Sequence, residues 1–165
     1  MTHCKKIRQA RLEDLDEILK IYDHAKIFMA QTGNPTQWAG SYPQRELLEE
    51  DIGNHGLYVV TEAGKICGVF YFVIGPDPTY LVIENGAWHS DKTYGTIHRI
   101  AGNGTGGVFG AVLDFCKRQI DYLRIDTHED NKVMQHVVTK HGFQPCGIIY
   151  TDDGSPRIAF DRLQL

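Results

Sequence analysis

The chain has no long apolar run and no closely spaced cysteines, and both absences exclude classes of protein. No stretch approaches the roughly 20 apolar residues that span a bilayer, and the N-terminal MTHCKKIRQARLEDL lacks the apolar segment of a signal peptide. The four cysteines, Cys4, Cys67, Cys116 and Cys146, form no CxxC pair, so neither a metal cluster nor a disulfide framework is indicated. We expect a cytoplasmic protein that holds no metal and binds no membrane.

A concentrated basic surface is also missing. The 165 residues include 17 Lys and Arg against 21 Asp and Glu, and the densest basic spots are the pairs Lys5-Lys6 and Lys117-Arg118. Nucleic-acid-binding domains gather such residues on one face, so we expect no nucleic-acid partner and a small-molecule substrate instead. Neither a repeat nor a linker interrupts the sequence, which predicts one domain over 1–165.

Strand and helix periodicities follow one another in an order typical of an α+β fold. Short connections between the strands of the first half predict antiparallel pairing, and a strand–helix–strand unit in the second half predicts a right-handed parallel crossover. The expected strands are 6–10, 57–62, 66–74, 80–84, 96–101, 122–127, 146–150 and 157–160, and the expected helices are 12–29, 44–53, 109–116 and 131–141.

A glycine-rich run, Gly102–Gly110, joins the strand TIHRIA to an apolar helix. Glycines allow tight turns that point amides inward, and a helix start adds unpaired N–H groups, so the run is suited to a diphosphate. A glycine loop without a ligand is the alternative. The GxGxxG spacing of Gly102, Gly104 and Gly107 follows a late strand of a meander, which argues against a dinucleotide fold, and no GK[ST] follows to make a Walker-type loop.

The order of elements resembles that of the GNAT acyltransferase superfamily over nearly the whole chain. The piece Gly104–Phe109 (GTGGVF) is similar to the family loop (Q/R)xxGxG/A that cradles the CoA pyrophosphate, and 131–143 (NKVMQHVVTKHGF) is similar to its helix that starts with Asn and ends in Gly-Phe. The resemblance implies a mixed, mostly antiparallel sheet flanked by helices, with a β-α-β crossover that binds acetyl-CoA. It implies cofactor contacts from Ile100, Gly102, Gly104, Gly106, Gly107, Phe109, Gly110 and Asn131.

Three positions depart from the family pattern. Gly104 stands where Gln or Arg is usual, Phe109 stands at the second Gly/Ala, and Val138 stands where a Tyr often serves as general acid. Beside the expected acetyl transfer to a primary amine of a small molecule or protein in a ternary complex, these departures favour an alternative. That alternative is a CoA-binding regulatory module with weak or no turnover. A GNAT-like interaction domain without CoA is a third reading.

Acetylation of an amine requires that the acceptor lose a proton, because an ammonium group titrates near pH ~10. Glu84 and His98 are the candidate bases, and Glu84 is also placed to bind a cationic acceptor. A hydrogen-bonded core histidine is the alternative for His98, and His128 is a weaker third candidate. Tyr150, Tyr94 or a water would replace the missing tyrosine acid, although the thiolate is a tolerable leaving group unassisted.

Both tryptophans, Trp38 and Trp88, are candidates for the wall of an acceptor pocket. Filling the ends of the core is the alternative for each. A covalent acyl-cysteine route is not favoured, because no cysteine has a histidine partner near the expected cleft. The sequence leaves the oligomeric state open, a homodimer included.

Overall fold

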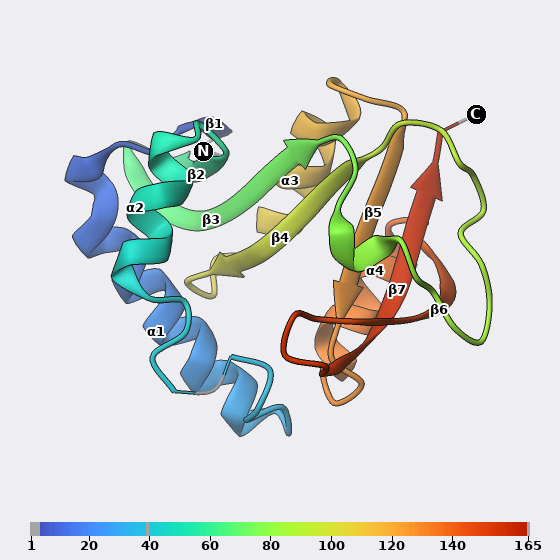
Figure 1. The fold of residues 1–165 in the computed structure, drawn as a ribbon. Helices are drawn as coiled ribbons and strands as arrows, with labels where there is room; N and C mark the ends of the chain where they lie inside the picture. The colour runs from blue at the N-terminus through green and yellow to red at the C-terminus, as the bar shows by residue number, and fades with distance from the viewer. Residues whose placement is uncertain (1–3, 39, 165) are drawn as a thin grey trace.

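A computed structural model of the chain describes residues 4–38 and 40–164. Its strands form one sheet in the order β1-β2-β3-β4-β5-β7-β6 (Figure 1). None of the helices in these ranges is long and apolar enough to cross a membrane. The strands are β1 (Lys5–Gln9), β2 (Leu57–Glu62), β3 (Lys65–Ile74), β4 (Gly95–Gly102), β5 (Tyr122–Thr127), β6 (Gln144–Tyr150) and β7 (Pro156–Leu163). The helices are α1 (Leu15–Gln31), α2 (Arg45–Gly53), α3 (Val108–Lys117) and α4 (Lys132–Lys140), with short 3-10 turns η1 (Leu12–Asp14) and η2 (Pro78–Tyr80).

The sheet is mixed and mostly antiparallel. Strands β1 to β4 pair antiparallel in chain order, and β7 lies antiparallel between β5 and β6. Among the described strands only β4 and β5 pair in parallel, and α3 makes the crossover between them. The predicted α+β architecture with a β-α-β crossover is therefore confirmed.

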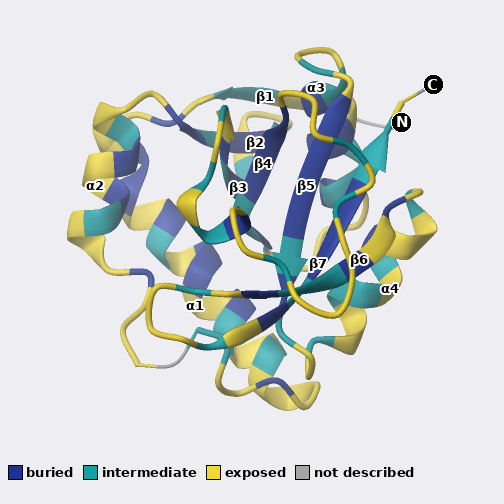
Figure 2. Cartoon of the chain, turned by 45° about the vertical axis from the view of Figure 1, so that its right-hand side comes forward, coloured by how far each residue is buried: buried dark blue, intermediate teal, exposed yellow. Residues whose placement is uncertain are grey.

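Alternating side chains divide the core between the two faces of the sheet. In β2, the fully buried Val59 packs with α1 and α2, whereas its neighbour Val60 packs with α3 on the opposite face, as the period of two requires. The buried side of α1 carries Ile18, Ile21 and Tyr22 at helical spacing. Figure 2 shows the dark, buried strands at the centre and helices whose outward sides are exposed.

Residues 80–84 do not form the predicted strand. The carboxylate of Asp77 accepts hydrogen bonds from the amide and hydroxyl of Thr79, 2.9 and 2.7 Å away, and so starts η2 in place of a strand. Because β3 pairs directly with β4, no further strand fits between them. The segment instead crosses the outside of the molecule, where Leu81 is 74% exposed and Glu84 makes an isolated bridge to Ile148.

Strands β4 and β5 separate soon after they meet. Their pairing is limited to Gly95 with Leu123 and Thr96 with Arg124, and Figure 1 shows the two strands diverging from that point. A bulge in β4 accompanies the separation, because the register with β3 shifts past His98 and Arg99 has a φ of 50°. The β4 edge beyond Thr96 therefore has no strand paired to it.

Candidate functional site

A cavity of about 830 Å³ lies where β4 and β5 separate, within the size range of small-molecule sites. Every residue of β4 from Ile97 to Gly102 lines it, so the unpaired strand edge forms one wall. The cavity is further lined by α1, the segment after α1, the Asp77 turn, β5, the start of α4 and the segment 149–157.

The glycine-rich run lies at one end of this cavity. Gly107 has the left-handed φ of 84° that favours glycine, and no side chain caps the start of α3 after it. The amides of Gly106, Gly107 and Val108 donate no hydrogen bond to the described part of the chain. A Cβ added to Gly106 would meet no atom within 4 Å. Uncapped amides beside open space fit a diphosphate.

The predicted cofactor contacts divide into two sets. Ile100, Gly102, Gly104, Phe109 and Asn131 line the cavity. Gly106, Gly107 and Gly110 lie in the same run without lining it.

Phe109 does not point back over the glycine run. Its ring packs against His141 and Phe143, which lie between α4 and β6, with centroid distances of 5.1 and 6.3 Å. Val138 has no exposed surface and belongs to the core, whereas Val137 lines the cavity. The position that often carries the family's tyrosine therefore faces the core in this chain.

His98 lines the cavity and makes a polar contact there. Its Nε2 lies 2.9 Å from Oδ2 of Asp77, which also lines the cavity. Burial raises the pKa of Asp77, but hydrogen bonds from His98 and Thr79 outweigh it and lower this pKa to about 2. An ionised carboxylate only accepts hydrogen bonds, so Nε2 donates and Nδ1 is the proton-accepting nitrogen of the neutral ring.

Sequence reasoning missed Asp77, although the signal was present. Asp-Pro-Thr is typical of a side chain that caps a turn by bonding the amide two residues later. Because residues 80–84 (YLVIE) were predicted to form a strand, the turn at their start was not predicted. His98 therefore matches both alternatives, because it is a hydrogen-bonded histidine and it also lines the cavity as a candidate base would.

Glu84 and Tyr150 lie outside the cavity, contrary to the expectation that Glu84 faces the cleft. They bond each other at the surface, where the tyrosine hydroxyl donates to the carboxylate over 2.9 Å. The reason is that residues 80–84 do not form the predicted strand beside β4, and Glu84 instead bridges to Ile148 of β6. Tyr94 is also elsewhere, and its buried hydroxyl accepts from the Asp77 amide.

The two tryptophans have different places. Trp38 lines the cavity and packs edge-on against Tyr22, with ring centroids 5.5 Å apart. Trp88 is not a cavity residue. It packs against Tyr80 and under the Arg124 guanidinium, 4.0 Å from its ring centroid, and donates to the Tyr80 carbonyl. It fills the core.

One cysteine does have a histidine partner, but away from the cavity. The sulfur of Cys146 lies 3.4 Å from Nδ1 of His89, which is 2.7 Å from Asp161. Burial, and then a hydrogen bond to Asp161, raise the pKa of the thiol to about 12. A thiol with such a pKa is a poor nucleophile at neutral pH, and neither Cys146 nor His89 lines the cavity.

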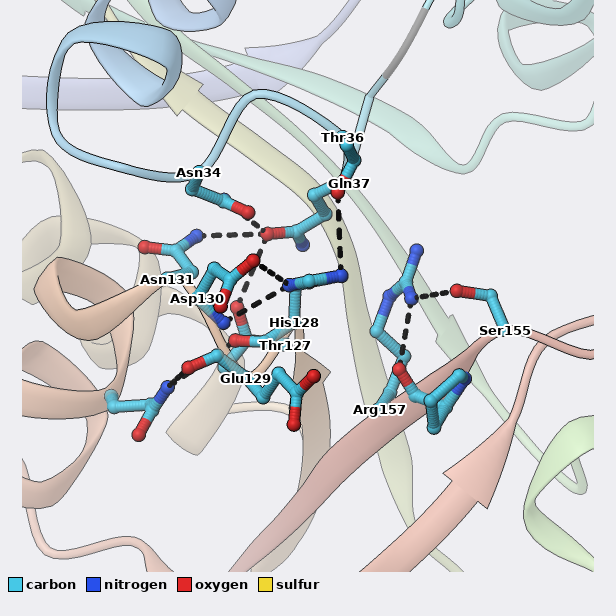
Figure 3. Close-up of polar contacts among 12 residues, drawn as sticks. Asn34, Thr36, Gln37, Thr127, His128, Glu129, Asp130, Asn131, Ser155 and Arg157 are labelled. Carbon is cyan, nitrogen blue, oxygen red and sulfur yellow. Dashed lines mark hydrogen bonds and ion pairs between the residues drawn. The ribbon is translucent and has the colours of Figure 1, made fainter.

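A polar network joins the segment after α1 to the start of α4 (Figure 3). Asn131 caps α4 by accepting from the Met134 amide at 3.0 Å, which turns its own NH₂ toward Oε1 of Gln37, also 3.0 Å away. The same oxygen accepts from Asn34 at 2.8 Å. His128 lies beside this network, with Nε2 3.5 Å from the Thr36 hydroxyl. No local motif marks Gln37, because its partners come together only in the fold.

Two substitutions of Asn131 separate its roles. We expect Asn131→Ala to cost roughly 1 kcal/mol of stability through the lost cap, a fall of about 2–4 °C in the unfolding temperature. Asn131→Asp keeps the acceptor for the Met134 amide but cannot donate to Gln37, so its loss should be smaller. Thermal unfolding measures both, and an equal loss in the two variants would contradict the capping role.

The sequence matches no protein-family model and no curated protein, but solved structures do match. A GNAT-family acetyltransferase from Streptococcus agalactiae is 30% identical, with 98% of this chain and 96% of that chain covered and a TM-score of 0.89. A Staphylococcus aureus protein described as an acetyltransferase is 27% identical over 95% and 97% of the two chains, with a TM-score of 0.67. A GNAT-family acetyltransferase from Listeria monocytogenes shares the fold, with 17% identity, 99% and 98% coverage and a TM-score of 0.70.

The two relatives above 25% identity are described as acetyltransferases, which supports an acyltransferase activity for this chain. The chain belongs to the GNAT family of acetyltransferases.

Proposed function

We propose that the protein transfers an acetyl group from acetyl-CoA to a primary amine by direct attack in a ternary complex. The observation that carries this proposal is the His98–Asp77 pair in the same cavity as the glycine-rich run. When bound, acetyl-CoA supplies an activated thioester carbonyl. The chain's residues then have to bind it, orient it and remove a proton from the acceptor.

Cofactor binding is assigned to the backbone. The uncapped amides at the start of α3 would hold the pyrophosphate, and the unpaired edge of β4 from Ile97 to Gly102 offers main-chain groups to an extended arm. Backbone amides near the β4 bulge, Ile100–Gly102, would stabilise charge that develops on the carbonyl oxygen.

The proton is assigned to His98. Asp77 has a pKa of about 2, so it is ionised at neutral pH and accepts a hydrogen bond from Nε2. Nδ1 of the neutral ring is then the nitrogen that takes the proton from the substrate amine. General base catalysis of this kind contributes roughly 10²–10⁴ in rate. The thiolate leaves without a tyrosine at position 138, which a thiol pKa of roughly 8.5 permits.

A CoA-binding module without turnover is the second candidate, favoured by Val138, which is buried in the core with no exposed surface. Two measurements separate the candidates. Acetyl-CoA at 100 times its Kd should stabilise the protein by roughly 2.7 kcal/mol, about 5–10 °C in unfolding temperature, and a panel of amines should release free thiol. Stabilisation without thiol release would favour the module, and no stabilisation at millimolar acetyl-CoA would contradict both.

A further inference from the structure

One arginine of the cavity wall makes no salt bridge with the described residues, although the exposed Asp153 lies within electrostatic reach of it. Arg157, at the start of β7, is only 9% exposed and lines the cavity. Its Nη1 donates to the Ser155 hydroxyl and, over 2.9 Å, to the Pro156 carbonyl. None of the ion pairs within residues 4–38 and 40–164 includes it. By contrast, the cavity's other arginine, Arg99, is paired with Asp51.

The unused part of this guanidinium is the edge formed by Nε and Nη2. These atoms make no hydrogen bond with the described residues, and Figure 3 shows the group extending away from the two partners of Nη1. Neither atom is among the fully buried polar atoms without a partner in the described residues, so this edge is accessible to a ligand. Two parallel N–H donors on one edge match the two oxygens of a carboxylate.

The sheet register places this edge on the same face as His98. Thr96 of β4 is paired with Arg124 of β5, so the side chains of His98 and Asp126, each two residues further on, project from the same face of the sheet. Tyr80 links them, because its hydroxyl donates to Asp126 over 2.6 Å and its ring centroid lies 6.2 Å from that of His98.

Across the next pairing, Asp126 lies opposite Ala159 of β7. Arg157 is two residues from Ala159, and side chains two apart in a strand share a face. Two interstrand spacings, roughly 10 Å, separate the backbones of β4 and β7 where the strands are paired. His98 and Arg157 line the same cavity, so a short molecule that contacts both would lie inside it.

We propose that the acceptor is a small amino acid, whose amine faces His98 and whose carboxylate is bound by Arg157. This inference rests on the proposed function and narrows its substrate class. Asp153, also a cavity residue, lies within electrostatic reach of Arg157, so a singly charged carboxylate meets less repulsion there than a doubly charged phosphate.

The test compares two matched series of acceptors. Glycine, β-alanine and 4-aminobutyrate are assayed for acetylation against methylamine, ethylamine and propylamine, which lack the carboxylate. We expect higher kcat/KM for the amino acids. Arg157→Gln should lower that value by roughly 10- to 100-fold, the effect of losing hydrogen bonds to a charged group, and leave the simple amines and the KM for acetyl-CoA unchanged. Arg157→Lys keeps the charge and should lose less.

Arg118→Gln is the control, because Arg118 is exposed and does not line the cavity. Equal use of both series by the wild type, an equal loss on both in Arg157→Gln, or a raised KM for acetyl-CoA would each overturn the inference. If no amine is acetylated, the proposed function fails by itself. The inference is then decided by thermal unfolding with 4-aminobutyrate, where stabilisation of the wild type but not of Arg157→Gln supports it and no stabilisation overturns it.

Discussion

His98→Gln is expected to lower kcat by roughly 10²–10⁴ at neutral pH, because it removes the proton acceptor of the cavity. Glutamine can still donate to Asp77, so the fold and the stabilisation by acetyl-CoA should be retained. The decisive measurement is kcat for wild type and variant between pH 7 and 10. As pH approaches the acceptor's own pKa of roughly 10, the free amine forms without a base, and the deficit should shrink.

His136→Gln is the matched control, since His136 is exposed on α4 and makes no side-chain contact with the cavity. It should retain wild-type activity. A deficit in His98→Gln that stays constant from pH 7 to 10 would mean that His98 only supports the shape of the cavity.

The partner carboxylate sets a second pH expectation. Because hydrogen bonds from His98 and Thr79 overcome the effect of burial and lower the pKa of Asp77 to about 2, this group stays ionised throughout the assay range. Its contribution to stability is present above the unfolded pKa of roughly 3.9 and is lost as pH falls through 2. Asp77→Asn should therefore unfold at a lower temperature than wild type at pH 7, and the difference should narrow toward pH 2.

Gly106→Asp is expected to raise the KM for acetyl-CoA by about 100-fold or more without destabilising the free protein. The added side chain enters open space, since a Cβ at Gly106 meets no atom within 4 Å. A carboxylate close to α3's start interacts favourably with the helix dipole, but it repels a diphosphate by about 4 kcal/mol per charge pair at 4 Å and an effective dielectric constant of 20.

Gly106→Asn has nearly the same shape without the charge and is the control. Its KM should stay within a few-fold of wild type, while thermal unfolding without acetyl-CoA should be alike for both variants. Equal KM values for Gly106→Asp and Gly106→Asn would contradict a pyrophosphate at the start of α3.

The sequence by itself determined the elements whose pattern is local. The helix at 131–141 and the strand at 122–127 were predicted nearly as they are, because a capping Asn and an apolar run specify them through neighbouring residues. The loop between β4 and α3 was also predicted correctly from the glycine-rich run, since glycines favour turns.

The tertiary structure decided what depends on residues far apart in the chain. The apolar run 80–84 has the composition of a strand, yet it is a turn and a surface loop, because β3 and β4 pair directly and Asp77 caps the turn. That pairing moves Glu84 out of the cavity and brings Asp77 to His98. The separation of β4 from β5 and the place of Arg157 arise from sheet register, which is set by pairing between strands and not by the residues of any one strand.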